Sequence, residues 1–493
     1  MRTSGKIARA AVFALSITPA LAVAQTPVDD GQVLDTRVPP SAEPVDDAPA
    51  PKTGDAVLDR LNAMEARIRQ LEARNAQLEA AAVDTQSRVE RVEVRSAKAA
   101  QPGVVPSFAD VNDNFTFKPR GTFQIDYAGF NERAGGYDYT NGTDIRRARF
   151  GFEGTAYKNF KWRIEAEYVK NTVNLLDAYL TYAFDPKLSV TVGQHKAPYG
   201  LEANTSDAIN TFLERSMGSN AFGAVGAERR VGVSVAYQTD TLNAALGLFG
   251  SGEAVTRNVV TPDESYGVNG RLTWEPLLDT GQVIHVGVSG YHVTNFPANS
   301  LNVSERPNVR VDGGNIESVT IPGTAPAVGP RTGAKAANFI GAEALLVRGP
   351  FSLQGEYGHL AVQRFGASTA KFDGFNVFGS WFLTGESRSL RNGNVDWIKP
   401  FNNFDPGNGH WGGFEVAARY DQLDLTDTTL SPLNRKATSL TAALNWYLNP
   451  NTKILFNYIR FKGQNSPLVV APVLLNGTTA KGDAVATRLQ FDF

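Results

Sequence analysis

The sequence predicts an all-β protein, a 16-stranded antiparallel transmembrane β-barrel preceded by an N-terminal coiled-coil helix. Three observations lead to this fold class. Apolar and polar residues alternate with period two in sixteen segments between Phe115 and Phe493. Residues 1–24 have the pattern of a secretory signal, and the chain ends on a strand with one apolar face and a terminal Phe493. Together they favour an outer-membrane barrel over a soluble sheet protein.

The chain begins with a signal peptide, predicted over residues 1–24. Arg2, Lys6 and Arg9 precede a short apolar run, and residues 22–24 form a small-x-small cleavage site. The apolar run is too short for a membrane anchor. Loss of these three cations changes the formal net charge from −2 to −5, so the overall charge gives no argument for an anionic ligand.

Residues 55–95 are predicted to form a coiled coil, between a disordered spacer at 25–54 and a linker at 96–112. A lone amphipathic helix is the alternative, but a seam this narrow can bury its apolar residues only against copies of itself, so we expect an oligomer. Asn75 would fix the register, and the pattern leaves two or three strands open. The seam residues follow alternating steps of four and three: Val57, Leu61, Met64, Ile68, Leu71, Asn75, Leu78, Ala82, Thr85, Val89 and Val92.

The transmembrane β-barrel is predicted over residues 113–493. In one representative segment, Phe160 to Tyr168, apolar side chains point one way and charged ones the other, because side chains alternate across a strand. A soluble sheet can show the same pattern, and the number of segments decides between the two. The segments are predicted to begin near Phe115, Asp144, Phe160, Asn174, Lys187, Arg230, Thr241, Ser265, Gln282, Ala337, Phe351, Lys371, Trp411, Lys436, Lys453 and Gly482.

The connections between these segments also fit a barrel. Short turns follow most even-numbered segments and longer connections follow most odd-numbered ones, as in bacterial outer-membrane barrels. The longest connection is Thr294–Ala336. One connection breaks the rule, since Thr384–His410 is long but follows an even segment. Either it is an extended periplasmic turn, or the count of segments is wrong by a pair there.

Composition excludes several other classes of protein. The mean hydropathy is −0.24, and no uninterrupted apolar run of about 18 residues follows the N-terminus, which excludes a helical membrane protein. The chain has no cysteine, so thiolate chemistry is impossible. The five histidines are scattered and form no recognisable catalytic or zinc-binding pattern. We therefore expect no enzyme, no cofactor, no metal site and no nucleic-acid partner.

Several framework motifs resemble one known family. They are DIRRARFGFEG, DAYLTYAF, VTVGQHKAPYGLE followed by FLERS, RRVGVSV, WFLTGES and GGFEVAARYDQLDL. In this combination the region from Phe115 to Phe493 is similar to the phosphate-selective porins O and P. The resemblance implies a 16-stranded trimeric barrel that forms a pore in the outer membrane. It also implies that a long loop after the fifth strand, here Lys196–Ala227, folds into the lumen.

The candidate site residues are cations on the polar faces of the predicted strands. A 16-stranded barrel leaves an aqueous channel, so side chains and loops that narrow the channel must set its selectivity. Arginine suits an anion path because its planar donor fork matches phosphate oxygens and stays charged. The alternative is that these arginines pair with lumen carboxylates and only stiffen the wall. The candidates for the substrate path are Arg147, Arg149, Arg163, Arg230, Lys196, Arg271 and Arg419.

The expected function is an outer-membrane porin that passes small hydrophilic anions such as phosphate. Its expected partners are outer-membrane lipid, two further copies of the chain in a homotrimer, and the barrel assembly machinery, which would recognise Phe493. The coiled coil would lie in the periplasm. One alternative is a structural envelope protein whose barrel is an anchor and whose coiled coil tethers the outer membrane to the cell wall. A secreted β-rich binding protein is another.

Overall fold

The computed structural model describes residues 58–79, 107–110, 114–252, 264–324, 329–470 and 479–493. The chain divides into two units, residues 1–88 and 89–493. The predicted signal peptide and spacer lie outside the described residues, as do the two ends of the predicted coiled coil. Within the described residues, we find no helix with the length and apolar character needed to cross a bilayer.

The first unit contributes one described helix, over residues 58–79. The predicted helix is therefore present, while its pairing with other copies stays a prediction. The helix presents an apolar stripe at steps of three and four residues, and each of these side chains is more than half exposed: Leu61, Met64, Ile68, Leu71 and Leu78.

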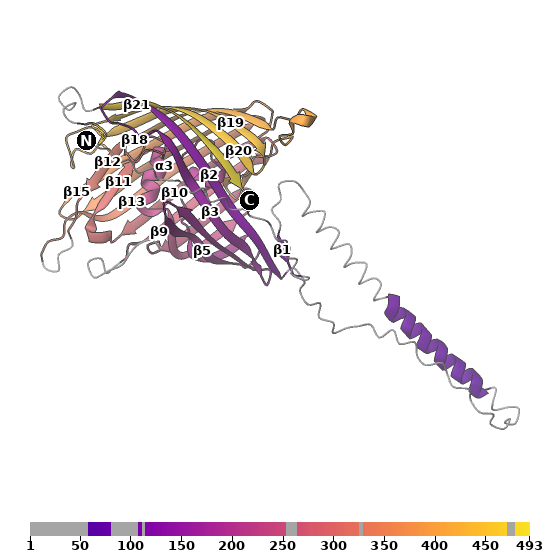
Figure 1. Cartoon of the computed structure of the whole chain (residues 1–493). Coiled ribbons are helices and arrows are strands. Elements are labelled where there is room, and N and C mark those ends of the chain that lie inside the picture. The colour runs from indigo at the N-terminus through magenta and orange to yellow at the C-terminus, as the bar shows by residue number, and fades with distance from the viewer. Residues whose placement is uncertain (1–57, 80–106, 111–113, 253–263, 325–328, 471–478) are drawn as a thin grey trace, which may run out of the picture. The chain divides into compact units, whose positions relative to one another are not determined.

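The second unit is a closed antiparallel barrel of sixteen strands, which confirms the predicted barrel (Figure 1). A two-residue strand, β1 (Phe108–Ala109), pairs with the first barrel strand, and the last strand, β21, pairs with the first, β2, to close the wall. The barrel strands are β2 (Phe115–Ala134), β3 (Gly142–Ala156), β4 (Phe160–Val169), β5 (Thr172–Ala183), β6 (Leu188–Lys196), β7 (Arg229–Gln238), β8 (Leu242–Phe249), β9 (Tyr266–Asp279), β10 (Gln282–Thr294), β13 (Ala334–Arg348), β14 (Phe351–Arg364), β15 (Ala367–Phe382), β18 (Gly413–Asp424), β19 (Lys436–Asn449), β20 (Thr452–Gln464) and β21 (Thr479–Asp492).

The two faces of the wall differ as the alternation predicts. In β21, Val485 and Leu489 are exposed on the outside, whereas Arg488 and Gln490 are buried on the inside. The same alternation runs along the other strands, for example in β7, where Val231, Val233 and Val235 are exposed and Arg230 and Ser234 are buried. An apolar exterior around a polar interior is the arrangement that suits a barrel in lipid.

Each predicted segment begins within four residues of an observed barrel strand, so the count of sixteen is right. The long Thr384–His410 connection is consequently an extended turn at the same end as the short turns. It contains β16 (Leu390–Arg391), β17 (Asn394–Val395) and the 3-10 helix η3 (Pro406–Asn408). Its first half enters the barrel, where Arg271 donates to the Gly393 carbonyl at 2.8 Å. Its second half lies on the outer face, where the Phe404 ring packs on Trp446.

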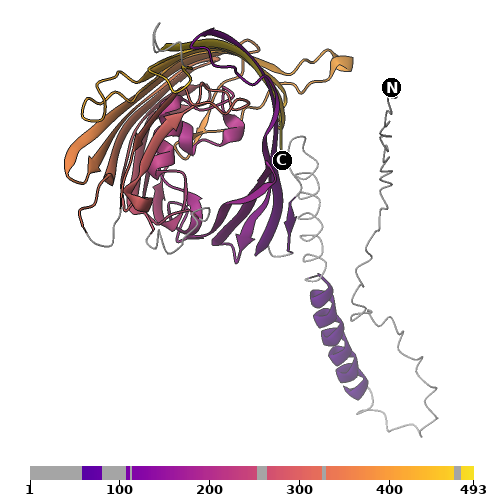
Figure 2. The same cartoon turned by 60° about the vertical axis from the view of Figure 1, so that its left-hand side comes forward.

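Two connections at the opposite end fold into the lumen (Figure 2). The first follows β6 and is called the infolded loop below; it contains α2 (Leu201–Asn204), η1 (Asp207–Ile209) and α3 (Met217–Gly226). The second follows β10 and contains η2 (Pro297–Asn299) and a hairpin of β11 (Leu301–Glu305) and β12 (Glu317–Ile321). The infolded loop falls within the Lys196–Ala227 stretch implied by the family resemblance.

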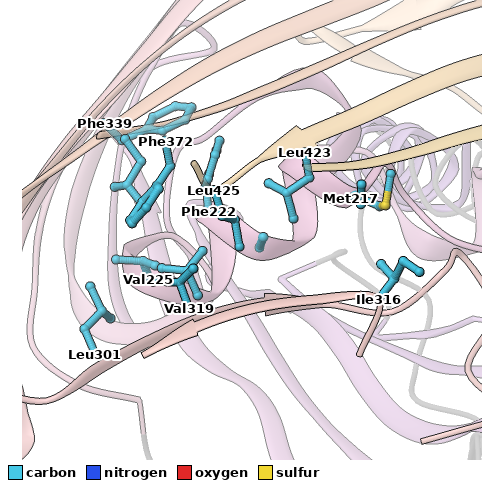
Figure 3. Close-up of a cluster of buried hydrophobic side chains, with 14 of the residues drawn as sticks. Met217, Phe222, Val225, Leu301, Ile316, Val319, Phe339, Phe372, Leu423 and Leu425 are labelled. Carbon is cyan, nitrogen blue, oxygen red and sulfur yellow. The ribbon is translucent and has the colours of Figure 1, made fainter. Parts of the chain in front are cut away.

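The largest apolar cluster lies inside the barrel, where α3 and the hairpin meet the inner wall (Figure 3). Phe222 and Val225 of α3 and Val319 of β12 are part of it. Helix α3 begins where the Ser216 hydroxyl accepts a hydrogen bond from the Ser219 amide, an N-cap that satisfies one otherwise free donor. A Cβ atom on Gly218 would stand 3.0 Å from the Gly374 Cα atom. Small residues therefore let the helix lie directly on the wall.

Candidate pore site

The infolded loop is bound to one side of the lumen, the wall made by strands β18 to β21. Side-chain donors on these strands bind carbonyl groups of the loop, which satisfies backbone groups that would otherwise be buried without partners. This side of the lumen is therefore filled by the loop. The donors and carbonyls are Arg419 with Glu214 at 2.9 Å, Asn445 with Thr211 at 2.9 Å, Lys453 with Asn210 at 2.9 Å, Arg488 with Leu213 at 2.5 Å and Gln490 with Ala208 at 2.7 Å.

The other side of the lumen contains a cavity of about 780 Å³, called the outer cavity below. It is bounded by the inner faces of β3 to β7, by the infolded loop and by the hairpin after β10. Nine cationic side chains line it against five carboxylates. The cations are Arg146, Arg147, Arg149, Lys170, Lys196, Arg215, Arg229, Arg306 and Arg310, and the carboxylates are Asp144, Glu167, Asp207, Glu228 and Glu305.

A smaller cavity of about 170 Å³, the inner cavity, lies toward the short-turn end of the barrel. Lys196 and Arg271 line it, and no carboxylate stands among the described residues that do so. Lys196 is common to both cavities. Its ammonium group donates to the carbonyls of Ala203 at 2.8 Å and Thr205 at 3.3 Å. Lys196 therefore lies where the linings of the two cavities meet.

A β-bulge in strand β3 brings one additional arginine to the outer cavity. Arg147 stands opposite Gln124 and Ile145 opposite Ile125, so Arg146 is an extra residue between them. A bulge bends a strand and re-aims its side chains. As a result Arg146 also points into the lumen, where it binds Glu214 at 2.6 Å. Two consecutive arginines in the sequence, Arg146 and Arg147, indicate that apolar and polar residues do not alternate strictly at this point of the strand.

Two carboxylates of the infolded loop each meet three arginines. Asp207 faces Arg147 at 3.4 Å, Arg149 at 2.6 Å, and Arg215. Glu214 faces three other guanidinium groups, those of Arg146 at 2.6 Å, Arg488 at 3.0 Å and Arg310 at 3.5 Å.

Both carboxylates are ionised because of these neighbours. Burial by itself raises the pKa of Asp207, but Arg147, Arg215 and Arg149 outweigh it and hold the pKa well below its ordinary value. Burial likewise opposes ionisation of Glu214, and the surrounding arginines hold its pKa well below the usual range. The loop therefore places two negative charges within the arginine clusters of the lumen.

The structure brings four of the seven predicted site residues to the two cavities. Arg147, Arg149 and Lys196 line the outer cavity, and Lys196 and Arg271 line the inner one. The Arg271 guanidinium also binds Glu343 at 2.5 Å and holds the turn that follows β15 through the Gly393 carbonyl.

The other three predicted site residues line neither cavity. Arg163 binds Glu153 at 2.7 Å on the inner face of β4. Arg230 donates to the Gly250 carbonyl at 2.6 Å. Arg419 lies over the Phe212 ring at 4.5 Å and binds the infolded loop.

The strand pattern missed several cations that do line the outer cavity. Arg229 lies beside the predicted Arg230, at the very start of β7, and binds Asp177 at 2.8 Å. Arg215 is on the infolded loop, and Arg306 and Arg310 are in the connection between β11 and β12. Loop residues have no alternation, so no signal in the sequence placed these three.

A closed antiparallel barrel with an apolar exterior, a polar lumen and connections folded inside defines an outer-membrane porin. The chain belongs to the phosphate-selective porin O and P family, whose model matches residues 117–493. The family and the fold are those of channel proteins.

Comparisons with individual proteins agree with this membership. The chain is 26% identical to Porin O of Pseudomonas aeruginosa over 415 residues, 78% of this chain and 90% of that protein. It is 28% identical to an uncharacterized protein of Caulobacter vibrioides over 423 residues, 80% of each. Among solved structures, the anion-selective porin from Comamonas acidovorans aligns over 77% of this chain and all of its own, with a TM-score of 0.50 and 15% identity, which shows a shared fold.

Proposed function

We propose that this porin is a water-filled diffusion channel selective for small hydrophilic anions, with phosphate-type anions as its leading substrate. The observation that carries the proposal is the excess of cations over carboxylates around the outer cavity, nine against five. The inner cavity is also lined by cations, Lys196 and Arg271. Membership of a family described as phosphate-selective, and similarity to Porin O, support the choice of anion.

The route for an anion follows from the geometry of the cavities. The anion enters the outer cavity at the long-loop end, where arginines remain charged at any physiological pH. It then passes Lys196 and reaches the inner cavity beside Arg271. Most of the arginines are also paired with carboxylates, as Arg149 is with Glu167 at 2.9 Å. Binding at each point is therefore weak, and conduction needs sites that a solute can both enter and leave.

The sign of the selectivity is measured directly by reconstitution. The full-length porin is inserted into a planar bilayer, and the reversal potential is recorded in a KCl gradient. We expect the potential to have the sign of chloride permeation. Phosphate added to the chloride solution should reduce the single-channel current, because it competes for the same cations. A cation-selective reversal potential contradicts the proposal.

We further propose that residues 55–95 form a periplasmic coiled coil that holds three barrels together, after signal cleavage at residues 1–24. The exposed apolar stripe of the helix over residues 58–79 supports the pairing, because it follows heptad spacing. Chemical cross-linking of the purified porin tests it. The full chain should give a trimer, and a variant lacking residues 26–107 should lose it or assemble more weakly. An unchanged trimer would place the contacts in the barrel instead.

We also propose that the terminal Phe493 is the recognition point for barrel assembly. Its amide and carbonyl pair with the carbonyl and amide of Gly121 at 3.0 and 2.9 Å, so the last residue belongs to the closing strand pair. Removal of Phe493 should lower the amount of folded barrel in the outer membrane. Refolding of the same variant from denaturant in detergent serves as the control, since it does not need the machinery.

A further inference from the structure

A group of basic side chains lies at the long-loop ends of β20, β21 and β2, which are neighbours in the wall (Figure 1). Lys462 of β20 stands directly opposite Lys481 of β21. In the same strand pair, Arg460 stands opposite Asp483. Arg133 of β2 reaches the Asp483 carboxylate at 3.5 Å. The four cations are called the outer basic patch below: Arg133, Arg460, Lys462 and Lys481.

The two lysines of the outer basic patch point away from the lumen. Phe461 precedes Lys462 in β20, is 2% exposed and belongs to the apolar cluster inside the barrel. Ala480 precedes Lys481 in β21, is fully buried and belongs to the same cluster. Because side chains alternate across a strand, both lysines are on the outer face of the wall. The patch is therefore separate from the anion path through the cavities.

The outer basic patch continues the apolar exterior of the same strands toward the long-loop end. On β20, Phe456 and Tyr458 are exposed and stand four and two residues before Arg460. On β21, Val485 is 62% exposed and follows Asp483 by two residues. Lipid tails cover such apolar side chains, and the long loops of outer-membrane barrels are extracellular. The patch therefore lies at the level of the headgroups of the outer leaflet.

Positive charge exceeds negative charge in this part of the exterior. Asp483 is the shared partner of both arginines, at 2.9 and 3.5 Å. Glu132 accepts a hydrogen bond from the Gly136 amide at 3.0 Å in its own connection. Lys462 and Lys481 form no ion pair within the described parts of the chain, although they face each other. Like charges opposite each other destabilise a strand pair, so an anion between the two lysines would stabilise this one.

The long-loop ends of β14, β15, β18 and β19 differ from the outer basic patch. His359 of β14 contacts Asp373 of β15 at 2.9 Å. Asp424 of β18 stands opposite Asp373, and Lys436 of β19 meets Asp424 at 3.7 Å. Carboxylates therefore accompany the basic groups on these strands, and the surplus of cations belongs to β20, β21 and β2.

We propose that the outer basic patch binds the phosphorylated headgroup of a lipid in the outer leaflet. The phosphate groups lie between Lys462 and Lys481 and on the guanidinium fork of Arg460, which matches phosphate oxygens. The acyl chains cover Tyr458 and Val485. Charge complementarity selects a phosphate group, and continuity with the lipid-facing surface selects a lipid over a free phosphate ion. The inference does not depend on which ions the pore conducts.

The test is the double substitution Lys462→Gln and Lys481→Gln in the full-length porin. The purified wild type and variant are titrated in detergent with lipid A that carries two phosphates, and native mass spectrometry measures the bound lipid. The variant should bind about thirtyfold more weakly, because each basic residue at an anionic lipid surface contributes about a factor of five. Added salt should also weaken binding to the wild type. Equal dissociation constants for the two proteins would overturn the proposal.

A matched control removes two lysines from another part of the same end of the barrel. Lys335 in β13 and Lys371 in β15 are both exposed and lie near the long-loop ends of their strands. The variant with Lys335→Gln and Lys371→Gln should bind lipid A within twofold of the wild type. An equal loss of binding in both double variants would show a general effect of net charge and would contradict a site at the patch.

Three further measurements separate the lipid from other occupants. Lipid A without its phosphates should bind the wild type no better than the lysine variant binds intact lipid A. Inorganic phosphate should displace no more lipid than chloride does at equal ionic strength; stronger displacement would indicate a site for free anions instead. Light scattering should give both double variants the oligomeric state of the wild type. Dissociation of only the Lys462 and Lys481 variant would make the patch a contact between copies of the chain and would refute the lipid site.

Discussion

The two sides of the lumen use the same residue types for opposite purposes. On the side of β18 to β21, Arg419 and Arg488 are at most 1% exposed and donate to carbonyls of the infolded loop. On the side of β3 to β7, Arg146, Arg147 and Arg149 line the outer cavity. The first side holds the loop, and the second leaves space for a solute.

The difference shows that the strand on which an arginine lies does not fix its role. What decides the role is what covers the guanidinium group on the lumen side. On the β18 to β21 side the infolded loop covers Arg419 and Arg488, which are desolvated and bind its backbone. On the β3 side Arg146 and Arg149 bind carboxylates of the same loop but also border the outer cavity, where a solute can approach them. Four substitutions and one matched control test this difference between the two sides, beginning with the substitution that should cost the most stability.

Arg488→Met should destabilise the barrel more than any other change proposed here. Arg488 binds Asp126 at 2.6 Å and Glu214 at 3.0 Å, and its removal leaves both carboxylates buried with a partner missing. Breaking a buried ion pair in this way costs about 3–5 kcal/mol. Thermal unfolding in detergent measures the loss, and single-channel recording should show a larger, noisier conductance as the loop detaches.

Arg460→Met is the matched control for that loss. Arg460 also pairs with an aspartate, Asp483 at 2.9 Å, but its side chain is 55% exposed. Exposed ion pairs contribute little to stability, because water and salt screen them. Equal unfolding temperatures for the two variants would contradict the view that the β18 to β21 side holds the loop.

Lys196→Gln should change conduction more than stability. Lys196 stands between the two cavities, and a unit charge within about 7 Å of an ion contributes ~2 kcal/mol at an effective dielectric constant of ~20. We expect the chloride conductance at low salt to fall roughly tenfold and the reversal potential to move toward cations. High salt should reduce the difference through screening. If the variant and the wild type have equal conductance at low salt, Lys196 does not lie on the anion path.

The selectivity should depend on pH through Glu305, which lines the outer cavity on the hairpin. Burial raises the pKa of its carboxyl from 4.5 to about 7, even though Arg310 acts in the opposite direction. Below pH 7 the folded channel therefore loses one negative charge at the cavity, and anion selectivity should increase as the pH falls through 7. Glu305→Gln should show the high anion selectivity at every pH. If the variant keeps the wild-type pH profile, Glu305 is not the group whose titration changes the selectivity.

The raised pKa of Glu305 also affects the free energy of unfolding. The folded state holds the Glu305 proton up to about pH 7, whereas the unfolded chain releases it near 4.5. The folded state therefore binds more protons between these values, and the free energy of unfolding should fall as the pH rises from 4.5 to 7. Thermal unfolding across this range should show a smaller decrease in Glu305→Gln than in the wild type.

Arg163→Gln should have the smallest effect. Arg163 and Glu153 are paired at 2.7 Å, but their side chains are 30% and 28% exposed, so the pair contributes less than about 1 kcal/mol. Arg163 lines neither cavity, and the reversal potential should stay at the wild-type value. A shift of the reversal potential as large as that expected for Lys196→Gln would show that anions pass close to β4.

The strands could be predicted from the sequence because their signal is local. The starts of β10, β14 and β19 are the predicted residues Gln282, Phe351 and Lys436, since alternation and turns depend on neighbours in the chain. The site could be predicted only in part. Arg147 and Lys196 follow from the strand pattern, whereas Arg146 needs the bulge and Arg310 needs the fold of the hairpin. The pairing of Asp207 with Arg149 and Arg147 joins residues 58 and 60 positions apart.

The pairing of β2 with β21 determines when the barrel can close during biogenesis. Twelve residue pairs join these two strands, from Thr122 with Asp492 to Ala134 with Lys481, although they stand at opposite ends of the barrel sequence. Unpaired strand edges are not tolerated in the hydrocarbon layer. Translation and secretion must therefore be finished before the wall can seal, and a prematurely terminated chain is left with two open edges for periplasmic proteases instead of forming a leak in the membrane.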